Sequence, residues 1–175
     1  MATALGRGLV TTDLVAGDAI IASDPSDAAR KNFVSAVPGA QAIDDNLRVA
    51  ADVDVLVLAV KPQHMDSALS EIGSRLPPDT LVVSIAAGVG LERLAGHLAS
   101  GARIARVMPN TPCLIGQGAS AFCLNGSAQP ADKECVSQML RAIGTAHEVP
   151  ESWLDAVTGL SGSGPAFVYT VIEAL

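Results

Sequence analysis

The chain has 175 residues, a length typical of one domain or of one domain and part of a second. Its formal net charge of −7 argues against a non-specific nucleic-acid binder, which needs a basic surface. No apolar run reaches the ~20 residues that span a bilayer, and the first residues do not form a signal-peptide pattern. We therefore expect a cytoplasmic protein that binds neither nucleic acid nor membranes.

Short strands and helices alternate from the start of the chain. The sequence predicts a helix over 2–10, a strand over 19–23, a helix over 26–36, a strand over 41–43 and a helix over 45–51. Ser26 or Asp27 can cap the second helix, because both side chains accept hydrogen bonds from free backbone N–H groups.

A nearly unbroken apolar stretch runs from Val53 to Pro62. A Val/Leu run that does not alternate with polar residues is typical of a central strand buried on both faces. It ends at Lys61, and Pro62 suits the first turn of a helix, which we predict to run to about Leu76. Ligands bind at the carboxyl ends of such strands. The alternative to a ligand site, which this stretch supports equally, is a core strand followed by a solvated Lys61.

The remaining strands are predicted over 81–85, 104–107, 119–124 and 146–149, with helices over 91–98 and 129–143. The strand at 119–124 could run antiparallel. From Glu151 the pattern is helical, with a break over 159–165. This alternation predicts an α/β fold: a Rossmann-like doubly wound parallel sheet over residues 1–150, followed over 151–175 by the start of an all-α domain.

Three strand ends carry unusual turns, and in a parallel sheet they share one edge. The turns are Ala59-Val60-Lys61-Pro62, Ala86-Ala87-Gly88-Val89 and Met108-Pro109-Asn110-Thr111-Pro112. Small residues let a ligand approach the backbone, and the N-termini of helices offer free N–H groups to an anion. Together with the positive charge of Lys61, the turns predict a nucleotide site.

Two polar residues could refine this site. Asp24 ends the strand at 19–23, where a carboxylate accepts hydrogen bonds from ribose hydroxyls and favours NAD, whereas a nearby Arg favours NADP. Arg30 and Lys31 follow about two helical turns later, so the cofactor could be NADP or NAD. Asp24 could equally have a structural role, ending the strand and capping a turn. The amide of Asn110 suits a nicotinamide carboxamide, although it could equally hold a structural turn.

Cysteines and histidines do not form a metal-binding pattern. The chain has Cys113, Cys123 and Cys135, and His64, His97 and His147, all widely spaced. We expect no metal site and no disulfide framework, with the cysteines acting as small buried hydrophobic residues.

Four segments strongly resemble the pyrroline-5-carboxylate reductase family, in the family's order and spacing. They are Leu56-Val57-Leu58-Ala59-Val60-Lys61-Pro62-Gln63, Ser84-Ile85-Ala86-Ala87-Gly88-Val89, Met108-Pro109-Asn110-Thr111-Pro112 and the run from Asp155 to Phe167. The resemblance implies reduction of 1-pyrroline-5-carboxylate to L-proline with NAD(P)H, the last step of proline biosynthesis, and a homo-oligomer. It does not identify which residue is catalytic. It implies that the cofactor is bound by Asp24, Asn46, Ala59, Val60, Lys61, Pro62, Ala86, Ala87, Gly88 and Asn110.

Within that set, the resemblance places Asp24 at the ribose 2′ substituent, Asn46 on the adenosine side and Asn110 near the nicotinamide. The family's first strand and glycine-rich phosphate loop, and its Ser-Pro-Gly-Gly-Thr-Thr substrate loop, have no counterpart in this sequence. We therefore expect the central strand to have an unpaired flank, and these 175 residues to be inactive alone. A weak dinucleotide-binding module, or a non-enzymatic remnant that pairs with a full-length subunit through Val168, Val171 and Ile172, is the alternative.

Overall fold

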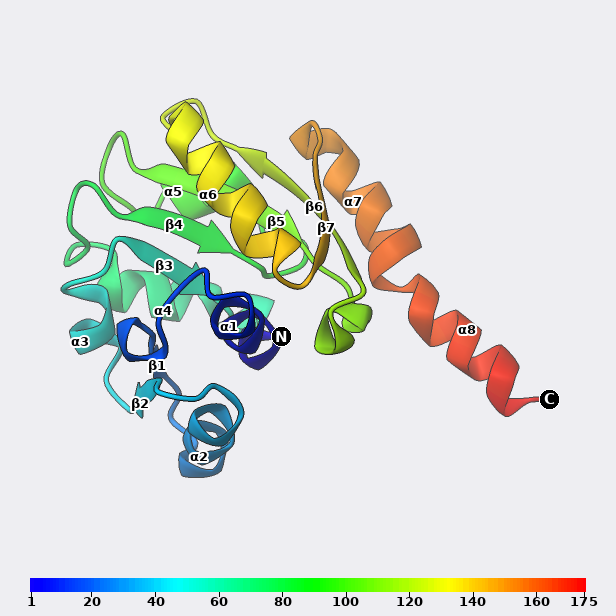
Figure 1. The fold of residues 1–175 in the computed structure, drawn as a ribbon. Coiled ribbons are helices and arrows are strands. Elements are labelled where there is room, and N and C mark those ends of the chain that lie inside the picture. The colour runs from blue at the N-terminus through cyan, green and yellow to red at the C-terminus, as the bar shows by residue number, and fades with distance from the viewer.

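A five-stranded sheet forms the centre of the computed structural model, which describes residues 1–175 (Figure 1). Its strands are β3 (Val55–Leu58), β4 (Leu81–Ser84), β5 (Arg103–Met108), β6 (Gly118–Leu124) and β7 (Gly144–Glu148), in that spatial order. The first three run parallel, β6 is antiparallel to β5, and β7 is parallel to β6. The predicted α/β fold is confirmed, and so is the antiparallel strand at 119–124.

A second, two-stranded parallel sheet pairs β1 (Ile21–Ser23) with β2 (Gln41–Ile43). No ladder of hydrogen bonds joins β1 to β3, and β3 has β4 as its single neighbour. In Figure 1 this small sheet lies beyond β3, on the side away from β4. The predicted unpaired flank of the Val53–Pro62 strand is thus confirmed.

Helices cover both faces of the five-stranded sheet. On one face, α1 (Ala2–Thr11) and α6 (Pro130–Arg141) contribute to a core cluster of 13 buried residues. On the other face, α3 (Asn46–Ala50), α4 (Met65–Ile72) and α5 (Leu91–Ala95) contribute to a cluster of 12. The remaining helix, α2 (Asp27–Ala36), packs beside the small sheet around a cluster of three, and Ser26 caps it as predicted.

Two predictions about the region around β3 are wrong. Val55 and Val57 are only half-buried, whereas all four residues of β4 are buried. Strand β3 lies at the edge of the sheet and β4 lies inside it. Fewer neighbouring residues cover an edge strand, which explains why the two valines of β3 are less buried. The predicted helix from Pro62 to Leu76 is a 3-10 turn over Pro62–His64 followed by α4, which ends at Ile72. Gly73 follows at once and is a poor helix former.

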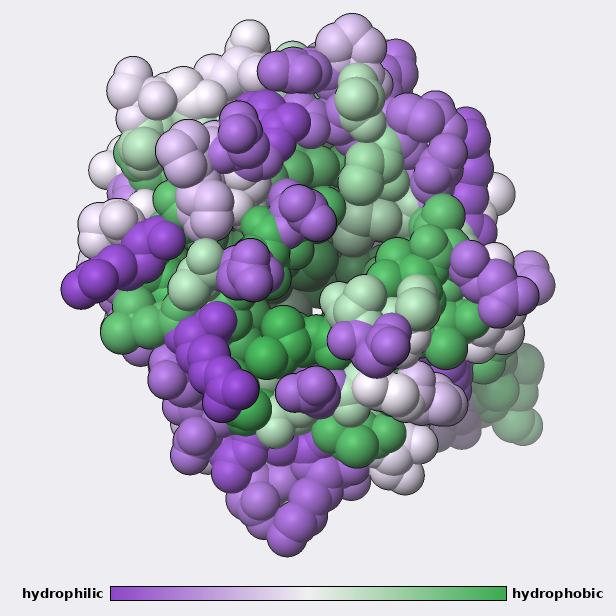
Figure 2. Space-filling model, turned by 60° about the vertical axis from the view of Figure 1, so that its left-hand side comes forward, coloured by the Kyte–Doolittle hydropathy of each residue, from purple (hydrophilic) through white to green (hydrophobic).

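The cysteines are unpaired, and Cys113 and Cys123 are buried as expected, while Cys135 is half-buried. Figure 2 shows hydrophobic side chains around a hollow on one side of the molecule, with hydrophilic ones toward the outer border. Apolar surface of this kind fits a sheet whose edge strand, β3, has a neighbouring strand on one side only.

After β7 the chain is helical to its end. A 3-10 turn (Glu151–Trp153) leads into α7 (Leu154–Val157), a π-helix (Thr158–Gly162) and α8 (Gly164–Glu173). The predicted break over 159–165 is confirmed as an interruption of the α-helix, although it takes the form of the π-helix and a turn at Ser163 rather than a loop. Figure 1 shows α8 extending away from the sheet. None of the helices has the length and apolar character needed to cross a membrane.

Candidate functional site

The three turns singled out in the sequence follow neighbouring strands at one edge of the sheet. Leu58 of β3 pairs with Ser84 of β4, and Ser84 pairs with Arg106 of β5. Because these strands are parallel, the residues after each one emerge on the same side. The edge brings together Ala59, Val60, Lys61, Pro62, Ala86, Ala87, Gly88 and Asn110.

The first turn presents a cation and free backbone donors. Lys61 is exposed and takes part in no ion pair. Its carbonyl accepts a hydrogen bond from the His64 N–H at 2.9 Å, which closes the 3-10 turn. The N–H groups of Val60 and Lys61 have no acceptor within the protein. Pro62 occupies the first helical position, where its missing N–H costs nothing.

The second turn offers backbone rather than side chains. The fully buried Ser84 hydroxyl accepts a hydrogen bond from the Ala86 N–H at 3.4 Å, which holds the turn against the sheet. Ala87 and Gly88 are exposed, and their N–H groups also lack an acceptor in the protein. Gly88 has φ of +72° with open space beside it, so a side chain here would be strained by the backbone and would intrude on the edge.

Asn110, in the third turn, is engaged by the protein on both sides of its amide. Its Oδ1 accepts from the Ala119 N–H at 3.0 Å, and its Nδ2 donates to Ser161 Oγ at 3.1 Å. Nearby, a Cβ added to Gly162 would lie 2.5 Å from Met108 Cε, so this turn packs closely on the π-helix. These contacts support the alternative in which Asn110 holds a structural turn. One N–H of Nδ2 remains free to bind a ligand.

An ion-pair network behind this edge was missed by sequence reasoning. Arg106 of β5 is 7% exposed, and its guanidinium contacts Glu151 Oε1 at 3.2 Å and Asp155 Oδ1 at 2.8 Å. Glu151 Oε1 also accepts from the Leu91 N–H at 2.7 Å, at the start of α5. The available signal was a charged residue inside an apolar strand, since a buried cation requires partners. The network fixes the helical segment against the edge.

The same neighbourhood contains Cys123 on β6. Burial, together with the negative charge of Glu151, raises the pKa of the Cys123 thiol to about 11. This cysteine is therefore protonated at neutral pH and is a structural residue rather than a nucleophile.

Asp24 and Asn46 form a separate group at the carboxyl end of the two-stranded sheet. The Asp24 N–H donates to the Ile43 carbonyl at 3.1 Å, which places it beside the end of β2. Asn46, at the start of α3, is hydrogen-bonded to Ser23 and donates from Nδ2 to Glu71 Oε2 of α4 at 2.8 Å. The predicted site residues thus lie in two groups, and the Asn46–Glu71 hydrogen bond links the small sheet to a helix of the large one.

The chemistry of this edge fits a nucleotide cofactor. Unpartnered N–H groups at two adjacent turns and a free lysine suit phosphate oxygens, and exposed small residues leave room for flat rings. The hydroxyl, amide and carboxylate groups of Ser23, Asn46 and Asp24 suit a ribose.

Known proteins agree with this description. Residues 1–88 match the family model described as NADP oxidoreductase, coenzyme F420-dependent, and residues 151–175 match the model for pyrroline-5-carboxylate reductase dimerisation. The pyrroline-5-carboxylate reductase of Methanosarcina acetivorans is 41% identical over the whole chain, and pyrroline-5-carboxylate reductase 3 of Mus musculus is 37% identical. The chain spans 64% and 63% of the lengths of these two relatives.

Solved structures extend the match to three dimensions. A pyrroline-5-carboxylate reductase from Coxiella burnetii superposes with a TM-score of 0.89 at 30% identity, covering 99% of this chain and 64% of that one. The Plasmodium falciparum pyrroline carboxylate reductase, solved with NADP bound, gives 0.88 at 33% identity and covers 98% and 62%. Prephenate dehydrogenase of Aquifex aeolicus, at 0.71 and 13%, shares the fold alone.

The fold and the family model over residues 1–88 define an oxidoreductase of the Rossmann type. Within that class, the chain belongs to the pyrroline-5-carboxylate reductase family.

Proposed function

We propose that the chain is the cofactor-binding part of an enzyme that reduces 1-pyrroline-5-carboxylate to L-proline with NAD(P)H. The observation that carries the proposal is the carboxyl edge of β3 and β4, where a free lysine stands beside unpartnered backbone N–H groups. Family membership supplies the reaction. A cytoplasmic location belongs to the same proposal and is supported by three unpaired cysteines.

The residues of the two turns have distinct roles in this proposal. The N–H groups of Val60, Lys61, Ala87 and Gly88 bind phosphate oxygens, and the Lys61 ammonium offsets their charge. The remaining N–H of Asn110 orients the nicotinamide carboxamide, and Asn46 and Asp24 bind the adenosine side. When bound, NAD(P)H supplies a hydride to the carbon of the substrate C=N bond while a proton adds to the nitrogen.

We assign residues 1–150 to the nucleotide-binding domain and residues 151–175 to the start of a helical domain that carries oligomer contacts. Leu160, Phe167, Val168, Tyr169, Val171 and Ile172 are all more than half exposed, an apolar surface that a helical partner would cover. The match of residues 151–175 to a dimerisation model favours another chain of the same family as that partner. This surface also supports the second candidate function, association with a full-length subunit without catalysis.

The groups described at the two sites are ones that bind a cofactor, and none of these residues is assigned a catalytic role. Binding of the cofactor is the function that these residues can show by themselves.

Calorimetric titration with NADH and NADPH tests the proposal. We expect weak but saturable binding, lost in Ala87→Asp, because a carboxylate at the second turn repels the phosphates. The matched control is Ala99→Asp, an equal change at an exposed position before β5, at the opposite end of the strands. Absence of heat at millimolar cofactor, or equal binding by both variants, would reject the assignment of this edge.

A further inference from the structure

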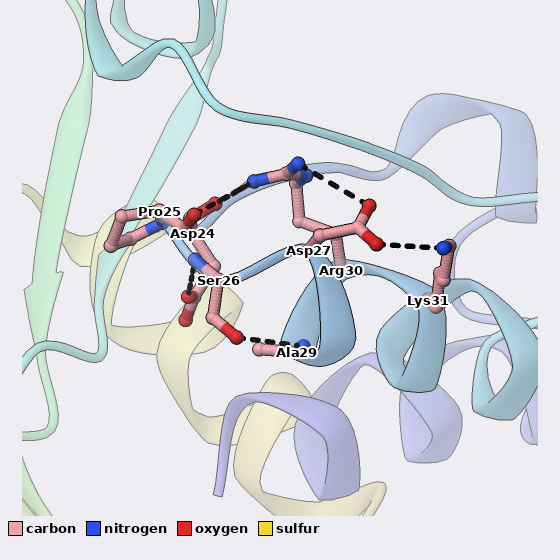
Figure 3. Close-up of polar contacts among 7 residues, drawn as sticks. All are labelled: Asp24, Pro25, Ser26, Asp27, Ala29, Arg30 and Lys31. Atoms are coloured by element: carbon pink, nitrogen blue, oxygen red, sulfur yellow. Dashed lines mark hydrogen bonds and ion pairs between the residues drawn. The ribbon is translucent and has the colours of Figure 1, made fainter.

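The proposed function assigns Asp24 to the adenosine side of the cofactor and leaves both NADH and NADPH open. The side chain lies where β1 ends and α2 begins, and Figure 3 shows the seven residues involved. This inference rests on the proposed function, because it concerns the adenosine side of the same site. It concerns the group on the ribose 2′ carbon, which is a hydroxyl in NADH and a phosphate in NADPH.

The Asp24 carboxylate is fixed in place and is not neutralised. Its Oδ1 accepts a hydrogen bond from the Ser26 N–H at 2.8 Å, across the turn between β1 and α2. It forms no ion pair with any Lys, Arg or His of the chain. Its other oxygen is therefore available as a charged acceptor at a strand end where ribose hydroxyls are commonly bound.

The two cations of α2 are occupied elsewhere. Arg30 Nη1 donates to the backbone carbonyls of Asp24 and Pro25, at 2.8 and 3.1 Å, and Arg30 Nη2 contacts Asp27 Oδ1 at 3.4 Å. Lys31 Nζ lies 2.6 Å from Asp27 Oδ2. Asp27 thus pairs with both cations, and the dashed lines of Figure 3 show that neither reaches the Asp24 carboxylate.

The end of the neighbouring strand adds further negative charge. Asp24 N–H is bonded to the carbonyl of Ile43, and Asp44 and Asp45 come directly after it. The Asp45 side chain is used to cap α3 through the Arg48 N–H, at 3.0 Å. A dianionic 2′-phosphate here would meet like charges, whereas a hydroxyl can donate to the carboxylate.

We propose that this chain selects NADH over NADPH, and that Asp24 is the residue that determines the selection. The free carboxylate accepts the ribose 2′-hydroxyl of NADH and repels the 2′-phosphate of NADPH. Arg30 does not rescue NADPH, because binding the phosphate would require it to leave two carbonyls and a carboxylate.

Titration of the 175-residue chain with NADH and NADPH, followed by calorimetry and by nicotinamide fluorescence, measures the ratio of their dissociation constants. We expect NADH to bind about tenfold more tightly or better, as expected for one like-charge contact at a partly screened site. Asp24→Ser should reduce this ratio about tenfold. The control Asp52→Ser, which removes the same charge from an exposed turn before β3, should leave it unchanged. Raising the salt to about 0.5 M should weaken the discrimination, because screening shortens the reach of the carboxylate.

A second comparison does not depend on any variant: adenosine 5′-monophosphate should bind more tightly than adenosine 2′,5′-bisphosphate. NADPH binding as tightly as NADH, or an unchanged ratio in Asp24→Ser, would overturn the inference and leave the proposed function standing. Failure of both cofactors to bind would overturn the proposed function and this inference with it.

Discussion

The two sheets of this protein have very different surroundings. Each strand of the two-stranded sheet has three residues, and no residue of β1 or β2 is fully buried. Strand β4 of the five-stranded sheet has a partner on each side and a helix layer on each face, and all four of its residues are buried. Both sheets contain β-branched residues, although the strands of the small sheet have only one isoleucine each.

Neighbours explain the contrast. The large sheet is packed into clusters of 13 and 12 buried residues, whereas the small sheet and α2 share a cluster of three. Regions with little buried apolar surface open locally at lower free energy than the global unfolding. The small sheet carries Asp24, and its link to the rest of the site includes the Asn46–Glu71 hydrogen bond. The adenosine side of the proposed site therefore lies on the less stable of the two regions.

The largest predicted effect is a difference between two isoleucines of the two sheets. Ile104 of β5 is fully buried, and Ile21 of β1 is half-buried against the same core cluster. We expect Ile104→Ala to lower the free energy of unfolding by about 3–4 kcal/mol and Ile21→Ala by about 1 kcal/mol, because the second leaves a smaller cavity. Urea unfolding followed by circular dichroism measures both.

Ile115→Ala serves as the control, since Ile115 is 76% exposed and should cost almost nothing. Hydrogen exchange adds a local test: the amides of β4 should be protected by the full free energy of global unfolding, and those of β1 and β2 should exchange faster. Equal losses of unfolding free energy in Ile104→Ala and Ile21→Ala, with equal protection of the two sheets against hydrogen exchange, would contradict the comparison.

Features set by local sequence were predicted correctly. The order of strands and helices, the Ser26 cap and the three turns at one edge follow from periodicity, capping residues and proline. The resemblance, rather than these patterns, pointed to an unpaired flank on β3. Because side-chain periodicity reports faces and not neighbours, the sequence could not show that Val55 and Val57 are only half-buried.

The contacts of the candidate site depend on residues far apart in the chain, and the sequence did not show them. Arg106 is paired across 45 and 49 positions with Glu151 and Asp155, and Asn110 across 51 with Ser161. No local pattern specifies such partners. The charge of Arg106 inside an apolar strand was a usable signal that a partner had to exist, though not which one.

The Arg106 network gives the next largest effect, since it joins the five-stranded sheet to the helical segment. We expect Glu151→Ala to destabilise the protein by about 2 kcal/mol, because it removes one partner of a buried cation and the acceptor of the Leu91 N–H. Asp155→Ala should cost less than about 1 kcal/mol, because the Asp155 side chain is 82% exposed. Urea unfolding distinguishes the two, and a larger loss in Asp155→Ala would show that Glu151 is not the principal partner.

The last effect concerns the thiol of Cys123, on β6 of the large sheet, and appears only at alkaline pH. Burial raises its pKa to about 11, from an ordinary value of 9.0. Its thiolate fraction at pH 8 should therefore be about a hundredfold lower than in the unfolded chain, and a disulfide reagent should label it correspondingly slowly. A cysteine placed in the small sheet by Ala22→Cys, where the residue is half-buried, should be labelled faster than Cys123.

The same shift makes stability depend on pH. Between pH 9 and about 11 the unfolded chain has lost the Cys123 proton and the native chain still holds it, so the free energy of unfolding falls as the pH rises. The free energy of unfolding of the Cys123→Ala variant should fall less steeply over this range. Cys113 and Cys135 remain in both proteins as an internal control. If the two proteins lose stability in parallel up to pH 11, or if Cys123 is labelled as fast as the cysteine at position 22, β6 is no better covered than β1 and the contrast between the two sheets is wrong.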